Sequence, residues 1–420
     1  MFETFVIISI YMLTRTLGIL GLVLLPASLT AQRASTMCNA PRAEPRGRVP
    51  VRVPIELSGN HVLLTVCAGG TRRLFLLDTG AGVNIIDIGV ARASGFTLGD
   101  PVNIGGAGAG VVRGAQVRAG ALTVPGLVGS FAANITYPVT RLKVAKGRSI
   151  VGILGFPFIS RYVMALDYVN RELRFYDPAA FAYSGSGVIV PLTFDENHPI
   201  VQAEVVLADG GRVPVRATID VGSNAALSIT KPIVDQHTLR TRVGRTMPWG
   251  GGGGVGGAVR SEIGRVRSFT IGTVTLTDVV TGMFGDSAGV FSVNRSWDVN
   301  IGGEILRRFT VFFDYGRQQM ILESHAGTRE RFEADMSGLR IITDTIPEQI
   351  RVMAVNPGSP AAEAGALPGD IVTRIDGRRA LVRDTESLRE RLRREGQQIE
   401  LTLRRGAETR TVRIATRRQI

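Results

Sequence analysis

Apolar residues occur along this chain mostly in short runs that Gly, Asp or Asn interrupt. Runs of about four to eight residues between such turn residues are typical of β-strands. Helical periodicity is scarce, and it predicts only short helices, at 156–161 and 303–308 and, with Leu388 and Leu392 one turn apart, at 385–395. The clearest predicted strands are 61–67, 74–77, 85–88 and 151–154. The pattern therefore predicts a β-rich protein.

The chain also repeats itself. Residues 155–168 match residues 302–315 without a gap, and an apolar strand follows each copy. Asp78 and Asp220 each end an apolar run, and they lie 142 residues apart, close to the 147 residues between the repeated segments. Because an internal duplication determines the whole architecture, we expect two homologous lobes, at 51–183 and 184–328.

A third unit is predicted at 336–420. It begins with strand-like runs at 339–342 and 350–355, and the turn Asn356–Gly365 then opens a short helix. The 385–395 helix and two further runs, at 399–403 and 411–414, complete an α+β domain.

Composition and charge narrow the possible functions. The 51 glycines and 6% aromatic residues fit β-rich domains. The net charge of +13 would suit an anionic partner, but the basic residues are dispersed and no nucleic-acid motif accompanies them. We therefore expect no nucleic-acid partner. The four histidines lack metal-ligand spacing, so no metal site is predicted.

The N-terminus has the features of an export signal. After Arg15 comes the apolar run 16–26 and then the small residues that end at Ala31, so residues 1–31 are predicted to be a signal peptide and 32–50 a linker. The protein is then periplasmic or secreted. A retained membrane anchor is the alternative, because 5–13 lengthens the apolar stretch. Cys38 and Cys67 could pair in such a compartment or stay as two thiols, and the sequence leaves this open.

The candidate chemistry lies at the two aspartates. Asp78 is followed by Thr79, Gly80 and Ala81, and Asp220 by Val221, Gly222 and Ser223. An ionised carboxylate at the end of a buried strand is costly unless it is paired or shares a proton. Two such acids in contact share one proton, and the pair can activate water for hydrolysis without metal, cofactor or covalent intermediate.

These motifs resemble those of retropepsin-like aspartic proteases, here in a single-chain, duplicated bacterial form spanning about 51–325. The resemblance implies an all-β fold of two pseudo-symmetric acid-protease lobes with Asp78 and Asp220 as catalytic dyad. The segments Ile153–Gly155 and Ile301–Gly303 match the family's hydrophobic-Gly element. The glycine-rich segments imply substrate-binding flaps, with Gly105, Gly106 and Gly108 in the first and Gly251, Gly252 and Gly253 in the second. Their alternative reading is plain flexible loops.

Two departures bear on activity. Val221 stands where the family has Thr or Ser, which removes half of the reciprocal hydrogen bonding between the lobes, and Glu304 stands where the first copy has Pro157. Two functions therefore stay open: an endopeptidase that cuts polypeptide substrates, and an inactive protease-like shell that binds peptides. Both acids lie in one chain, so a monomer suffices for an active site.

Residues 336–420 resemble a PDZ domain of the type attached to exported bacterial proteases. The matching segments are Val355–Ala361 and Pro368–Val372. In that family a peptide adds as a strand and backbone N–H groups capture its terminal carboxylate. The resemblance places this capture at Ser337, Gly338, Leu339 and Arg340. The alternative is a domain that packs on the protease without binding peptide.

Overall fold

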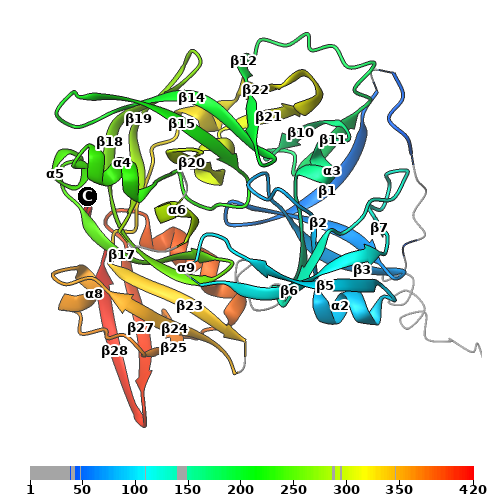
Figure 1. The fold of residues 1–420 in the computed structure, drawn as a ribbon. Coiled ribbons are helices and arrows are strands. Elements are labelled where there is room, and N and C mark those ends of the chain that lie inside the picture. Colours follow the sequence, from blue (N-terminus) through cyan, green and yellow to red (C-terminus); the bar gives the residue numbers. More distant parts are fainter. Residues whose placement is uncertain are drawn as a thin grey trace, which may run out of the picture. The chain divides into compact units, whose positions relative to one another are not determined.

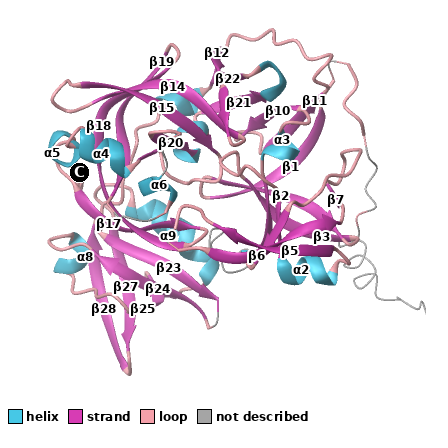
Figure 2. Cartoon of the chain, viewed as in Figure 1, coloured by secondary structure: helices cyan, strands magenta, loops and turns pink. Residues whose placement is uncertain are grey.

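The computed structural model describes residues 38, 43–47, 49–108, 110–139, 149–285, 289–293, 296–345 and 347–420. The predicted signal peptide and most of the predicted linker lie outside this part. Strands dominate, and the helices are few and short (Figure 2). Within the described residues, none of the helices is long and apolar enough to cross a membrane. The prediction of a mainly β protein is confirmed.

The first half, residues 51–183, builds one continuous sheet (Figure 1). Its alternating or wholly apolar strands bury one or both faces, as the pattern Val51, Val53 and Ile55 on β1 illustrates. Its strands are β1 (Val51–Ser58), β2 (His61–Ala68), β3 (Thr71–Leu77), β4 (Ile85–Asp87), β5 (Thr97–Ile104), β6 (Val112–Ala119), β7 (Leu122–Thr123), β8 (Ile135–Tyr137), β9 (Ile150–Leu154), β10 (Val163–Asp167) and β11 (Glu172–Tyr176). The short helices are α2 (Ile88–Ala93) and α3 (Phe156–Ile159).

The second half, residues 184–328, contains a six-stranded barrel. Strands β14, β15, β20, β16, β19 and β18 pair in that order, and β14 also pairs with β18 to close the ring. The strands are β12 (Val188–Pro191), β13 (Thr193–Asp195), β14 (His198–Val206), β15 (Arg212–Asp220), β16 (Leu227–Ile229), β17 (Met247–Gly254), β18 (Gly257–Ile271), β19 (Val274–Phe284), β20 (Val299–Gly302), β21 (Phe309–Asp314) and β22 (Gln319–Ser324). The helices are α4 (Lys231–Gln236), α5 (Leu239–Arg242), α6 (Val290–Val293) and α7 (Gly303–Leu306), with 3-10 turns η2 (Tyr315–Arg317) and η3 (Ala326–Arg329).

The two halves share a sheet and a core. Strand β10 of the first half pairs with β21 of the second, Leu166 opposite Val311, so the order β12-β22-β21-β10-β11-β1 crosses from one half to the other. One apolar cluster continues from Leu64 and Phe175 into Ile219 and Phe313. The predicted short helices before these strands are confirmed as α3 and α7. The halves are therefore fixed to each other by backbone pairing as well as by packing.

The C-terminal unit has its own antiparallel sheet and its own core. The strands are β23 (Leu339–Thr345), β24 (Glu348–Val355), β25 (Ile371–Ile375), β26 (Arg378–Arg379), β27 (Gln398–Arg405) and β28 (Glu408–Ala415), with helices α8 (Pro360–Glu363) and α9 (Thr385–Leu392) and the turn η4 (Val382–Asp384). Leu388 and Leu392 of α9 are buried with Val352 and Leu401. Strand β23 lies at one edge of the sheet.

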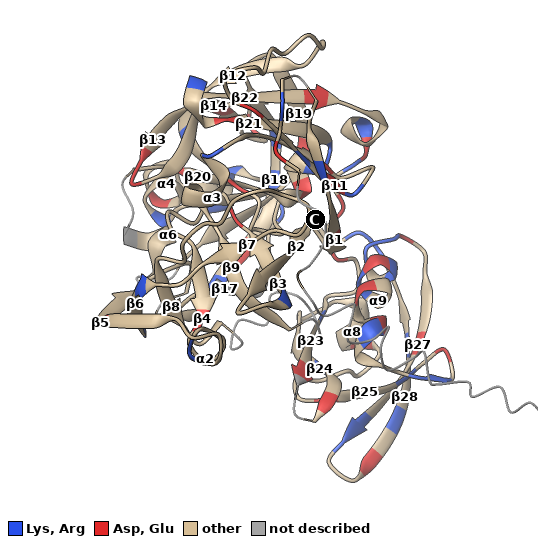
Figure 3. Ribbon diagram, turned by 90° about the vertical axis from the view of Figure 1, so that its right-hand side faces the viewer, with Lys and Arg blue, Asp and Glu red and all other residues tan. Residues whose placement is uncertain are grey.

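Charged residues occur in both halves and in the C-terminal unit, with Lys and Arg interspersed with Asp and Glu (Figure 3). Many are paired, as Arg405 is with Asp370 at 2.7 Å and Arg351 with Asp344 at 2.8 Å. The excess positive charge is thus dispersed rather than gathered in one stripe.

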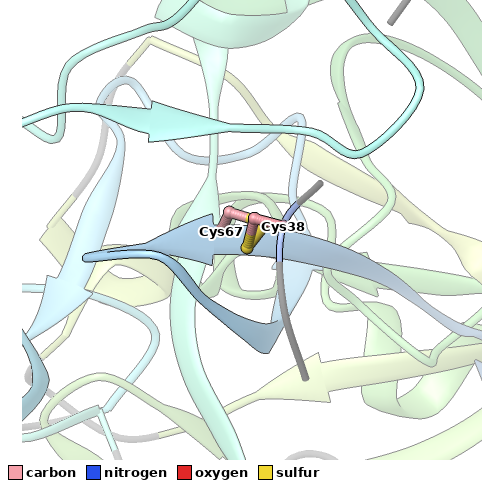
Figure 4. The surroundings of a disulfide bond; sticks show 2 residues. All are labelled: Cys38 and Cys67. Atoms are coloured by element: carbon pink, nitrogen blue, oxygen red, sulfur yellow. A yellow bond between two sulfur atoms is a disulfide. The ribbon is translucent and has the colours of Figure 1, made fainter. Parts of the chain in front are cut away.

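Cys38 and Cys67 form a disulfide, which the sequence had left open (Figure 4). The bond joins the start of the described chain to β2, with the two Cα atoms 6.0 Å apart and a sequence separation of 29 positions. It therefore fastens the N-terminal segment to the first half.

We expect the double variant C38S/C67S to be less stable than the parent. Closing a loop of this length restricts the unfolded chain, and its loss should lower the free energy of unfolding by about 3 kcal/mol. Urea unfolding of the oxidised parent, the reduced parent and the variant measures this. A variant as stable as the oxidised parent would contradict the structural role of the bond.

Candidate active site

Asp78 and Asp220 occupy the same local structure in the two halves. Asp78 follows β3, which pairs in parallel with β9, and Asp220 ends β15, which pairs in parallel with β20. The turn after each acid folds back over a glycine of the neighbouring strand: Phe156 N–H donates to Ala81 O at 2.9 Å, and Gly303 N–H donates to Ser223 O at 2.7 Å. A Cβ on Gly155 or Gly302 would collide with these turns. The repeat seen in the sequence is therefore a repeat of site geometry.

The two turns meet, so that each glycine of one half faces the acid of the other. A Cβ on Gly80 would lie 2.8 Å from Cγ of Asp220, and one on Gly222 would overlap the carboxyl of Asp78. Any larger residue at either position would push the opposing acid away. These two glycines are thus required by close approach, and the structure brings the two predicted acids together.

The carboxyl groups of Asp78 and Asp220 face each other across the two turns, and two acids in such contact share a proton rather than both ionise. Burial, the negative charge of Asp220 and a hydrogen bond with it raise the pKa of Asp78 well above its usual value, against the opposing effect of the Gly80 N–H. Burial also raises the pKa of Asp220, but less than that of Asp78, because hydrogen bonds from the Asn300 side chain, from Asp78 and from the Gly222 and Ser223 N–H groups oppose the effect of burial. The two acids are therefore unequal.

Thr79 connects the two halves directly below the acids. Its hydroxyl donates to Ile219 O at 2.7 Å and accepts from Val221 N–H at 2.9 Å, and its side chain is buried. Val221 is buried too and offers no hydroxyl in return. The Ser223 hydroxyl accepts from Ala225 N–H, within its own turn, and so does not replace the missing bonds. One residue thus makes both hydrogen bonds of this bridge.

A second polar bridge lies beside the Asp220 turn. Asn60, from the first half, donates its N–H to Oδ1 of Asn224 at 3.0 Å and its side-chain amide to Asn224 O at 2.9 Å. The same amide donates to Glu304, which also pairs with Arg307 and with the fully buried Arg308. Burial raises the pKa of Glu304, but its arginine partners outweigh this and lower it. Sequence reasoning noted Glu304 only as a departure from the repeat and missed Asn60 and Asn224.

Asn300 is a further site residue that sequence reasoning missed. It lies on β20, buried, and its side-chain Nδ2 donates to Oδ2 of Asp220 at 2.6 Å. A signal for it was present, because it is the one polar residue in the apolar run 299–301.

The two predicted flaps are β-hairpins whose tips touch. The β5–β6 hairpin carries Gly105, Gly106 and Gly108, and β17, which includes Gly251, Gly252 and Gly253, pairs with β18. Gly108 N–H donates to Val255 O at 2.7 Å, and Gly110 N–H donates to Gly256 O at 2.8 Å. The backbones approach so closely at Gly108 that a Cβ there would overlap Gly256 and Gly257. Gly105, Gly106 and Gly108 thus lie in a hairpin loop that contacts the second tip at Val255 and Gly256, whereas Gly251, Gly252 and Gly253 lie in strand β17.

Each hairpin tip packs on the opposite half. Val255, from the second hairpin, packs on an apolar cluster of the first half that includes Ala81 and Tyr137. Ala107, from the first hairpin, packs on a cluster of the second half that includes Phe284 and Trp297. The two tips thus cover two apolar surfaces, one in each half.

In the C-terminal unit, the predicted carboxylate-capture residues have internal partners. Asp335 Oδ1 accepts from Ser337 N–H at 3.0 Å and from Gly338 N–H at 2.6 Å, and Leu339 N–H donates to the Ser337 hydroxyl. Arg340 lies over the ring of Trp249, and burial lowers its pKa to about 10. A peptide carboxylate would have to displace these contacts. The described residues include no cluster of His, Cys, Asp or Glu suited to a metal ion.

We expect the T79V variant to be less stable than the parent. Valine keeps the shape of threonine but leaves Ile219 C=O and Val221 N–H buried without a partner, at about 1–3 kcal/mol for each group. T79S retains the hydroxyl and is the matched control. Urea unfolding should order the proteins parent, T79S, T79V. Equal stability of T79V and T79S would show that the bridge does not hold the halves together.

Two protein families match separate parts of this chain. Residues 64–158 match the aspartyl protease family, a segment that holds the Asp78 turn, the first hairpin and Gly155 but ends before Asp220. Residues 351–405 match the PDZ domain family. No curated protein matches the chain. The chain thus contains a retropepsin-like aspartyl protease domain at residues 64–158 and a PDZ domain at residues 351–405.

Proposed function

We propose that this protein is an exported aspartic endopeptidase in which residues 51–183 and 184–328 are the two pseudo-symmetric lobes of a single-chain retropepsin-like enzyme. The observation that carries the proposal is the facing pair of Asp78 and Asp220, one from each half, on equivalent turns. Such a pair shares a proton and is the arrangement that hydrolyses amides without a metal; aspartic proteases are the standard example of this effect.

In this mechanism, the ionised carboxylate takes a proton from a water molecule held between the two acids. The water oxygen attacks the scissile carbonyl carbon, while the protonated acid gives its proton to the carbonyl oxygen. Collapse of the resulting diol breaks the C–N bond: the amine leaves with the proton that the base had taken, and one diol hydroxyl returns a proton to the other acid. The dyad then holds one proton, as at the start.

Extended polypeptide is the substrate class that the site favours. The hairpin tips are rich in glycine, whose exposed backbone can hydrogen-bond to a strand-like chain laid beneath them. The clusters around Tyr137 and Phe284 offer apolar surface to side chains on either side of the scissile bond. Substrate would replace the contacts that Val255 and Ala107 make there, so the hairpins must open first.

Export rests on the N-terminal sequence, and an oxidising compartment suits the Cys38–Cys67 disulfide. The role proposed for the PDZ domain is recruitment of substrate or partner peptides, by strand addition at the edge strand β23. The N–H groups of Ser337 and Gly338 must leave Asp335 before they can hold a terminal carboxylate.

The variants D78N and D220N should each lose at least about 10³-fold in kcat/KM, because neither an asparagine nor a lone acid can both remove and supply the proton. Cleavage of a chemically unfolded protein, followed by mass spectrometry of the products, measures this. D209N is the matched control, since it removes an exposed carboxylate that pairs with Arg242. Parental rates in D78N would overturn the proposal. A parent that binds peptides but cuts none would favour the peptide-binding shell, which the loss of a hydroxyl at Val221 also favours.

A further inference from the structure

Asn300 and Ile153 hold equivalent places beside the two acids. Asn300 pairs with Thr218, two residues before Asp220, and Ile153 pairs with Leu76, two residues before Asp78. The strands β20 and β9 are parallel neighbours of the acid-bearing strands in their respective halves. The same position thus carries an amide donor in one half and a hydrocarbon in the other.

The amide of Asn300 is directed to the acid. The Asn300 Nδ2 atom lies 2.6 Å from Oδ2 of Asp220. The Asn300 Oδ1 atom is buried, and no donor among the described residues contacts it. Leaving a carbonyl oxygen buried without a donor is costly. An apolar residue would fill this space without that cost. The amide of Asn300, in contrast, supplies a hydrogen bond to the Asp220 carboxylate.

A hydrogen bond from an amide is stronger to a carboxylate than to a neutral carboxylic acid. The Asn300 bond therefore favours the charged form of Asp220, and it has no equivalent at Asp78, which accepts from Gly80 N–H at 2.8 Å. From this geometry we infer that Asn300 is a positioning residue that keeps Asp220 as the ionised member of the dyad, so that Asp220 acts as base and Asp78 as acid. The inference rests on the proposed function, and it assigns the roles of base and acid to particular members of the dyad.

With these roles, the water proton passes to Asp220 and the Asp78 proton passes to the carbonyl oxygen as the C–O bond forms. On collapse, Asp220 returns its proton to the leaving nitrogen, and the diol returns one to Asp78. No other co-reactant is needed, and the dyad regains its starting protonation.

Few other charges act on this pair. Three buried tyrosines interact electrostatically with the pair: Tyr137 and Tyr315 with Asp78, and Tyr168 with Asp220. Burial is the main cause that raises the pKa of each phenol; the nearby acids add to it, and at Tyr168 Arg307 opposes it. All three phenols therefore stay neutral in the range where carboxyl groups titrate. Within the described residues, neither Asp78 nor Asp220 forms an ion pair with Lys or Arg, so the difference between them lies in their hydrogen bonds.

The test is the pH profile of peptide cleavage by N300L, which keeps the shape of asparagine but cannot donate, and by N300S, whose side chain is too short to reach. Without the donor, Asp220 is harder to ionise, so the acidic limb of kcat/KM should move to higher pH by about one unit. KM should stay unchanged, because the Asn300 side chain is buried and donates to Asp220. The D209N variant, which removes an exposed carboxylate outside the site, should keep the parental profile.

A second readout does not depend on activity. Titration of ¹³C-labelled aspartate carboxyls by NMR, assigned with D78N and D220N, should show Asp220 ionising first in the parent and at higher pH in N300L and N300S. Unchanged carboxyl titrations in both folded variants would overturn the inference, even for a parent that cuts nothing. A parent without cleavage but with the expected titrations would instead overturn the proposed function alone.

Discussion

The candidate site depends on the contact between two carboxyl groups, because two acids this close share one proton rather than both ionise. Asp78 and Asp220 come from different halves of the chain, each on a turn at the end of a buried strand. Ionisation of either acid in this setting is costly unless the other stays protonated and donates a hydrogen bond to it. The shared proton requires contact within hydrogen-bonding distance. This explains the glycines that face the opposing acids, the sheet that β10 and β21 share, and the Thr79 bridge below the pair.

The two halves meet this requirement by unequal means. Thr79 supplies both hydrogen bonds of the bridge, and Val221 supplies none. The second half has further polar contacts around its turn, from Asn224 to Asn60 and from Asn300 to Asp220. The hydrogen bonds that Val221 cannot make are thus accompanied by other polar contacts around the same turn. In our account this asymmetry gives the two acids different tasks.

Local patterns predicted the fold well and the site in part. Short apolar runs predicted the strands, and the duplication predicted that the turns of Asp78 and Asp220 would be equivalent, because both depend on nearby residues. Local patterns could not predict contacts between side chains that are far apart in sequence. Asn60 contacts Asn224, for example, because the fold brings together two loops from different halves. The mutual contact of the hairpin tips and the Asp335 carboxylate at the Ser337 and Gly338 N–H groups depend in the same way on three-dimensional register.

Neutron diffraction from crystals of the protein at neutral pD would test the central claim most directly, because it locates the proton itself. The account predicts a single deuteron between the two carboxyl groups, bound to Asp78, with the Asn300 amide deuterium directed at Asp220. Two bare carboxylates turned away from each other, or a deuteron on each acid, would contradict it.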